Sequence, residues 1–419
     1  MSSPGQTRHA RRSGWRRVAT ACLLVPLSAI LVQCGKSPSA GMLAANTQAA
    51  SGDNFDDRFP APQFKDRFPT EKESFVQRQV ALPPKSAART ESAARVDPAP
   101  VRVASIAPTL TLPKPSTRDE DLTTLVSMKS SAFPYFGNNP RSDAPFLNVG
   151  SGDRKGHRSY GGRVYWQNET YNDNRVLVHV PETFDASKPG VIVVFFHGNG
   201  ATLERDVRDR QLVPQQISDS GVNAVLLAPQ LAVDAADSSA GKFWQPGGFK
   251  RFMDESVSHL ARLYGDPKSA QAFANMPIVV IGYSGGFLPT AWSLDVGGVT
   301  NRVRGVVLLD AVYGELDKFA SWIENNRSGF FVSSYTRYTK PRDRELMSML
   351  REKGISVTES MDGPIRPGSV VFVQTREGIT HRSYVTQAWT EHPIREVLVK
   401  MAATPALTRM ASAPSTTGR

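Results

Sequence analysis

The pentapeptide GYSGG at residues 282–286 places Ser284 between glycines in the pattern G-x-S-x-G. The apolar run PIVVI before it (277–281) predicts a short buried strand, and FLPTAWSL after it predicts a helix. A sharp strand-to-helix turn strains the backbone at the serine, and the flanking glycines leave out Cβ atoms that would collide there. The hydroxyl would then lie over a helix N-terminus, whose free N–H groups stabilise negative charge. The pattern predicts a nucleophilic serine, and an ordinary glycine-rich turn is the alternative.

A second glycine-rich sequence, HGNG at residues 197–200, directly follows the apolar run VIVVFF at 191–196. A nucleophile that attacks a carbonyl needs N–H donors where negative charge develops on the oxygen, and losing one donor costs about 3 kcal/mol. We expect this loop to supply donors from three residues, Gly198, Asn199 and Gly200. The N–H of Gly285 would be the other donor, and Tyr283 is a further candidate for substrate contact. A plain strand-to-helix turn is the alternative for this loop.

A serine hydroxyl is a weak nucleophile unless an imidazole removes its proton. The position of five of the seven histidines in the chain argues against that role: His9, His157, His179, His197 and His259. His381 lies seven residues past the last predicted strand, in a loop at the carboxyl ends of the strands. His392 precedes Pro393 at the start of the final predicted helix, where a surface cap is expected. We therefore predict that His381 is the base.

An acidic residue is needed to orient the imidazole and to stabilise its cation. Asp310 ends the apolar run VVLLD, on the first strand after the strand that carries the serine. The next strand is followed by no acidic residue until Asp343, which is the reserve candidate. The alternative for Asp310 is that it only caps the loop after its strand.

These candidates require a scaffold that brings the ends of several strands together. Strands are predicted at 163–166, 175–180, 191–196, 222–228, 277–281, 303–309, 330–333 and 370–374, the first two as a hairpin. Helices are predicted at 203–218 with a break at Pro214, and at 249–264, 287–294, 316–325, 342–353 and 394–401. This alternation predicts an α/β fold, a mostly parallel sheet with helices on both faces.

Ser284, Asp310 and His381 follow one another in the chain order of α/β-hydrolases. Residues 175–200 also resemble the entry of secreted esterases of the feruloyl-esterase and polyhydroxyalkanoate-depolymerase type, and the resemblance covers about 140–403. It implies the α/β-hydrolase fold and a serine hydrolase that cleaves a carboxylic ester or a related acyl bond. It names no substrate, because this fold hosts many chemistries.

The loop 231–248 also opens at the predicted catalytic edge, where ligands enter such sheets. Trp244 in this loop is a candidate for an acyl or aromatic pocket, and packing in the core is its commoner role. The sequence contains no metal-ligand cluster, phosphate loop or dinucleotide fingerprint, so we predict no cofactor and no metal.

The N-terminus has the pattern of an export signal at residues 1–34, with an arginine-rich start and an apolar run at 18–32. The run is short for a membrane span. LVQCG around Cys34 resembles a bacterial lipobox, although Gln33 replaces the small residue expected there. Lipidation of Cys34, a plain signal peptide and an uncleaved anchor all remain open. Each places the body of the protein outside the cytoplasmic membrane, either periplasmic, lipid-anchored to the envelope or secreted.

The remaining chain divides by composition. Residues 35–125 are predicted to be a disordered linker, since eleven of the 86 residues at 35–120 are proline, against a usual ~5 per cent. The hydrolase domain is expected at 126–403 and a disordered tail at 404–419. The formal charge of +11 falls to +6 without the five arginines at the N-terminus (11 − 5), which gives no argument for a nucleic-acid partner.

The sequence thus predicts an exported esterase acting on a small-molecule or polymer ester, and leaves open whether its N-terminus attaches it to the membrane. An acyltransferase that uses the same serine and a cell-envelope acceptor is one alternative. A non-catalytic binding or scaffold protein on a hydrolase-like fold is the other.

Overall fold

Eight strands form one mixed sheet in the order β1-β5-β7-β6-β8-β9-β10-β11. The computed structural model describes residues 120–409. The strands are β1 (Leu122–Ser127), β5 (Arg175–Val180), β6 (Val191–Phe196), β7 (Ala224–Pro229), β8 (Ile278–Tyr283), β9 (Val303–Leu309), β10 (Phe330–Tyr335) and β11 (Val370–Gln374). Strands β6 to β11 run parallel, whereas β5 is antiparallel to both β1 and β7. The predicted fold class, a mostly parallel sheet, is confirmed.

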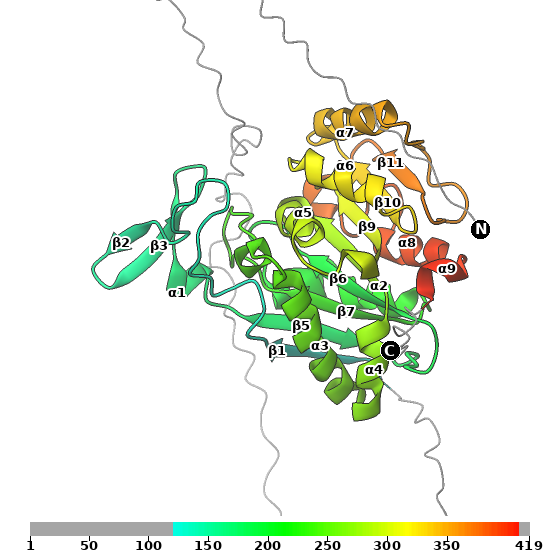
Figure 1. Ribbon diagram of the computed structural model, residues 1–419, viewed down its shortest axis with the longest axis horizontal. Helices are drawn as coiled ribbons and strands as arrows, with labels where there is room; N and C mark the ends of the chain where they lie inside the picture. The colour runs from blue at the N-terminus through cyan, green and yellow to red at the C-terminus, as the bar shows by residue number, and fades with distance from the viewer. Residues whose placement is uncertain (1–119, 410–419) are drawn as a thin grey trace, which may run out of the picture. The chain divides into compact units, whose positions relative to one another are not determined.

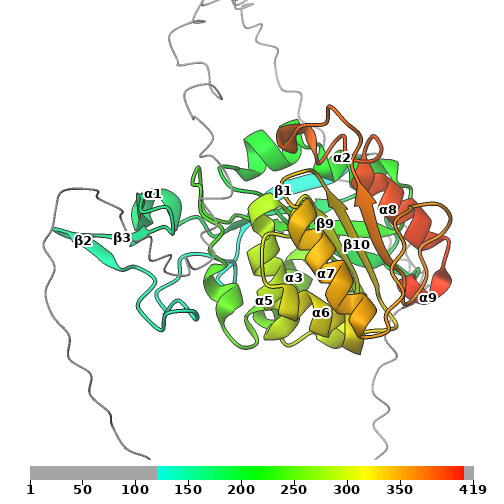
Figure 2. The same cartoon turned by 90° about the horizontal axis from the view of Figure 1, so that it is seen from above.

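Helices cover both faces of this sheet (Figures 1 and 2). Alternate side chains of each strand enter two separate cores. On β6, Ile192, Val194 and Phe196 face one core, and the residues between them face the other. The first core is covered by α3 (Gly248–Tyr264), α4 (Ala270–Asn275), α5 (Phe287–Asp295), α6 (Leu316–Asn325) and α7 (Lys340–Glu352). The second is covered by the π-helix η3 (Leu203–Arg210), α2 (Val213–Asp219), α8 (Pro393–Ala402) and α9 (Pro405–Thr408). Because β6 is buried on both faces, it reads as a continuous apolar run.

The predicted hairpin of 163–166 with 175–180 is wrong. Strand β4 (Val164–Trp166) belongs to a separate sheet of order β2-β3-β4, with β2 (Val149–Ser151) and β3 (Arg154–Arg158). Helix α1 (Gln167–Thr170) follows β4 at once, and β5 pairs with β1 and β7. The turn signal at 172–174 thus marks a passage from one sheet to another.

The predicted helix at 203–218 is two helices, and the break falls before Pro214. Leu212 adopts a positive φ of 52°, and Pro214 lies in the first turn of α2. A proline there lacks only an N–H that the helix would leave unpaired, so it favours the start of a helix.

The predicted domain limits are too narrow at both ends. Strand β1 begins at Leu122, inside the predicted linker. All of its residues pair with β5, so it belongs to the folded domain. Helix α9 lies beyond 403, and Leu407 is buried in the second core. The predicted export signal, Cys34, most of the linker and the end of the tail lie outside the described residues. Among residues 120–409, no helix has the length and apolarity needed to cross a membrane.

Candidate active site

Strand β8 ends at Tyr283, and the chain turns at Ser284 into a short 3₁₀ segment (Ser284–Gly286) that leads directly into α5. Ser284 has a positive φ of 52°, a conformation that non-glycine residues adopt only when their surroundings impose it. A Cβ on Gly286 would lie 2.2 Å from the carbonyl oxygen of Phe196, so only glycine allows β6 to approach this closely. The strained turn holds the serine hydroxyl at the carboxyl end of the central strand.

Three residues from distant parts of the chain meet at this edge. His381, in the loop after β11, lies with Nε2 2.7 Å from Ser284 Oγ. Its Nδ1 lies 2.6 Å from Asp310 Oδ2. An ionised carboxylate can only accept a hydrogen bond, so Nδ1 carries the ring proton and Nε2 accepts the hydrogen bond of the serine hydroxyl. The structure therefore brings together the three residues that the sequence singled out.

Asp310 is fully buried directly after β9, with a positive φ of 47°. Its Oδ1 accepts hydrogen bonds from the N–H and hydroxyl of Thr336 and from the hydroxyl of Thr339, at 2.8–2.9 Å. Burial alone would raise the pKa of Asp310, but the hydrogen bond and charge of His381, together with these donors, outweigh it and lower the pKa. Asp310 is thus held as an anion facing the imidazole.

Asp343, the reserve acid, lies in α7 and is also fully buried. It hydrogen-bonds Ser333 Oγ through Oδ1, and within residues 120–409 its Oδ2 has no hydrogen-bond partner. Burial, with the negative charge of Asp310 nearby, raises its pKa well above the usual range. No hydrogen bond joins Asp343 to His381 in the described part of the chain, so the acid that orients the imidazole is Asp310.

The HGNG loop is held in place by His197, which is structural. Its Nε2 accepts from the N–H of Leu231 and the amide of Gln230, and its Nδ1 donates to the carbonyl of Gly198. A Cβ on Gly198 would lie 2.8 Å from Ser284 Cβ, so the loop passes directly beside the nucleophile. The loop and Gly285 thus lie beside the serine, and their N–H groups are candidate donors to an oxyanion.

Gly200 does not have the predicted role of a donor to the substrate. Its N–H donates to the carbonyl oxygen of Ala235 at 2.8 Å, and its φ of 70° turns the chain away toward η3. The N–H groups of Gly198 and Asn199, with that of Gly285, therefore remain the candidate oxyanion donors.

Tyr283 and Trp244, which the sequence offered as substrate contacts, have other roles in the structure. The Tyr283 hydroxyl donates to the carbonyl oxygen of His381 at 2.7 Å, and its ring stacks on the imidazole at 5.2 Å between centroids. Tyr283 therefore positions the base. Trp244 is buried and packs edge-on against Tyr135 and Phe146, so it belongs to the core.

Sequence reasoning missed several residues that shape the site. Thr336 and Thr339 hold Asp310, and Ser238 Oγ donates to Asn199 Oδ1 at 3.1 Å. Tyr313 lies with its ring edge-on to His381, at 6.5 Å between centroids. The threonines could have been found, because they follow β10 at the same edge as Asp310. Ser238 lies in a long loop without periodicity, and no sequence signal identifies it.

The strand order, the strained turn at Ser284 and the Ser284–His381–Asp310 arrangement together have the architecture of the α/β-hydrolase fold, which the resemblance implied. No protein-family model matches this chain, and no curated protein sequence does. Among solved structures, an S-formylglutathione hydrolase from Agrobacterium tumefaciens is 11% identical, with 59% of this chain and 94% of that chain covered at a TM-score of 0.35. A feruloyl esterase module from Clostridium thermocellum is 14% identical, with 65% and 96% covered at 0.36. An IroE-like serine hydrolase from Shewanella oneidensis is 13% identical, with 54% and 74% covered at 0.34. At such values the fold assignment rests on the strand order and site geometry of this chain.

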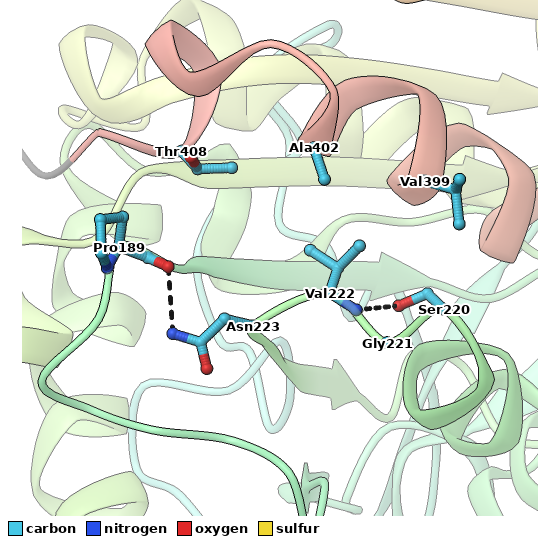
Figure 3. A pocket seen from close by; sticks show the side chains of 8 residues that line it. All are labelled: Pro189, Ser220, Gly221, Val222, Asn223, Val399, Ala402 and Thr408. Atoms are coloured by element: carbon cyan, nitrogen blue, oxygen red, sulfur yellow. Dashed lines mark hydrogen bonds between the residues drawn. The ribbon is translucent and has the colours of Figure 1, made fainter.

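A cavity of about 360 Å³ lies at the opposite edge of the sheet (Figure 3). Its lining includes Pro189 and Asn223, which precede β6 and β7, and Val399 and Ala402 of α8. The Asn223 amide donates to the carbonyl of Pro189, as the dashed line in Figure 3 shows. Because β6, β7 and β8 run parallel, their starts lie at the edge away from Ser284, so this cavity is separate from the candidate site.

Proposed function

We propose that the protein is a serine hydrolase that cleaves carboxylic esters through an acyl-serine intermediate. The observation that supports this best is the pair of hydrogen bonds that links Ser284, His381 and Asp310, at 2.7 and 2.6 Å. Ser284 is 9% exposed, the His381 side chain 24% and Asp310 fully buried. The acid is therefore shielded from water while the nucleophile and base remain reachable by a substrate.

In the first half of the reaction, His381 Nε2 takes the proton of Ser284 as Oγ attacks the ester carbonyl carbon. The negative charge that forms on the carbonyl oxygen is stabilised by the N–H of Gly285 and by those of Gly198 and Asn199. The imidazolium, held by ionised Asp310, then gives its proton to the departing alcohol. Water repeats the sequence on the acyl-serine and releases the acid.

The test is labelling with a fluorophosphonate probe and hydrolysis of p-nitrophenyl esters of graded chain length. Ser284→Ala is expected to abolish labelling and to lower kcat by roughly 10⁴-fold or more, because the attacking atom is gone. Ser321→Ala, on the exposed face of α6, is the matched control and should behave as wild type. Equal labelling of wild type and Ser284→Ala would end the proposal and favour the binding or scaffold alternative.

Two finer points belong to the same proposal. The same acyl-serine would pass its acyl group to a cell-envelope alcohol if such an acceptor outcompeted water, and product analysis with and without acceptor separates transfer from hydrolysis. We also propose export and attachment to the envelope through the N-terminus, on the arginine-rich and apolar start of the chain. Cell fractionation tests export and attachment. If Cys34→Ser moves the protein from the membrane fraction to the soluble fraction, Cys34 carries a lipid anchor.

A further inference from the structure

Two polar side chains lie on the side of Ser284 away from the other triad residues. In the sheet order, β6 and β7 lie on one side of β8, whereas β9, β10 and β11 lie on the other. Asn199 follows β6 and Ser238 lies in the loop after β7, while Asp310 and His381 follow β9 and β11. The departing alcohol must face His381, from which it receives a proton. The opposite side, with Asn199 and Ser238, is therefore left for the carbonyl oxygen and the acyl group.

The pair lies directly against the residue after the nucleophile. A Cβ on Gly285 would lie 2.0 Å from Asn199 Oδ1 and 2.7 Å from Ser238 Oγ, so these two side chains fill the space that a side chain at 285 would take. The Ser238 hydroxyl donates to Asn199 Oδ1 at 3.1 Å. Within residues 120–409 the Asn199 amide nitrogen has no hydrogen-bond partner, and both side chains are half-exposed. The two N–H bonds of the Asn199 side-chain amide can therefore donate to a ligand.

The loop that carries Ser238 is braced on several sides, which fixes the pair in advance of binding. Asp237 accepts hydrogen bonds from the Tyr171 hydroxyl at 2.7 Å and from Ser239. The N–H of Ala236 donates to the Tyr165 hydroxyl at 3.1 Å. Tyr171 and Tyr165 belong to the segment around α1 and β4, so this small sheet region supports the active-site edge.

We propose that Asn199 and Ser238 form an acyl-side subsite for an oxygen atom, so that acyl groups with an ether or hydroxyl oxygen on the carbon next to the carbonyl are preferred over plain alkyl chains. This rests on the proposed esterase function. An acyl oxygen would accept from the Asn199 amide, whereas a methylene in the same place would leave that donor unpaired. A site built to hydrogen-bond a substrate group discriminates against the analogue that lacks it. Because water still reaches Asn199, we expect a preference of about tenfold.

The experiment compares p-nitrophenyl methoxyacetate with p-nitrophenyl butyrate, which differ by one oxygen in place of one methylene. Each kcat/KM is divided by the rate of the same ester with hydroxide, which removes the intrinsic reactivity of the methoxy ester. Wild type is expected to prefer methoxyacetate by about tenfold, and Asn199→Ala and Ser238→Ala to bring the ratio near one. Asn301→Ala, exposed before β9, is the matched control and should keep the wild-type ratio.

Two results would overturn the subsite. One is a wild-type ratio near one, and the other is an equal loss on both esters in Asn199→Ala, which would place its amide on the oxyanion. Fluorophosphonate labelling of each variant reports whether its active site is folded. If Asn199→Ala does not label, the ester preference of Ser238→Ala tests the subsite instead. Absence of labelling in wild type would instead reject the esterase proposal itself, so the two failures are distinguishable.

Discussion

At the scale of single residues, the pKa values of two buried carboxyl groups near the site are shifted in opposite directions. Asp310 has three hydrogen-bond donors on Oδ1 and an imidazole on Oδ2, and its pKa is lowered. Within residues 120–409, Asp343 accepts a hydrogen bond from Ser333 on Oδ1 and none on Oδ2, and its pKa is raised. Burial acts on both carboxyls in the same direction, so the hydrogen bond and charge of His381 and the threonine donors at Asp310 make the difference. A neutral Asp343 also avoids repulsion with Asp310.

This contrast predicts different outcomes for the same substitution at the two positions. Asp343→Asn replaces a neutral acid with a neutral amide of the same shape, so kcat should stay within a few-fold of wild type. Asp310→Asn removes the charge that orients the imidazole, and kcat should fall by roughly 10³–10⁴-fold. Steady-state kinetics on one p-nitrophenyl ester measures both. A loss in Asp343→Asn as large as that in Asp310→Asn would mean that Asp343 works as an anion.

At the scale of elements, two buried histidines join neighbouring parts of the sheet, and their burial favours the neutral form. His197 links the end of β6 to residues 230 and 231 after β7. His179 on β5 contacts Thr123 of β1 and Ser218 of α2. Burial lowers the pKa of each from 6.5 to about 4. In the unfolded chain both would titrate near 6.5.

The consequence is a loss of stability in mild acid. As the pH falls from 6.5 toward 4, the unfolded chain takes up protons that the folded chain refuses, so the free energy of unfolding decreases through this window. Each histidine should contribute about 2 kcal/mol to the difference between pH 7 and pH 5. Urea titrations at the two pH values measure it, and His179→Gln should reduce the difference by that amount. An unchanged difference in this variant would show that His179 is not neutral in the fold.

The same scale shows why most of the main sheet could be predicted from the sequence. Strands such as β6 and β9 are buried on both faces, so they read as continuous apolar runs, and their helices carry a clear 3.6-residue period. Strand β1 reads LTTLVS and lies at the sheet edge, where half-buried residues give a weak pattern. Strands β2 and β3 are short and rich in glycine and charge, so no periodicity marks them.

The site was predictable to the extent that chemistry follows from residue type and strand end. Ser284, Asp310 and His381 each come directly after or shortly after a buried strand, and parallel strands end at one edge. Tyr283 and Gly200 were assigned to the substrate because sequence does not reveal hydrogen-bond partners. Their contacts with the carbonyl of His381 and with Ala235 depend on loops whose paths only the structure gives.

At the scale of the whole chain, the folded unit extends further toward the N-terminus than composition indicates. Strand β1 pairs with β5 from Leu122 to Ser127, and Asp121 accepts a hydrogen bond from the N–H of Glu182. Met128, directly after β1, is fully buried against α3. Without β1, strand β5 would become the sheet edge and would expose its unpaired N–H and C=O groups.

We therefore predict that a chain of residues 120–409 keeps the stability of the full-length protein, whereas a chain of 128–409 does not. Loss of the β1 ladder and of the Thr123–His179 contact should lower the free energy of unfolding by on the order of 3 kcal/mol or more. The exposed edge of β5 should also promote association. Urea titration and light scattering of the two chains measure these effects, with full-length protein as the reference. Equal urea midpoints and equal scattering would show that β1 is dispensable and that the boundary predicted from composition, at 126, is the working one.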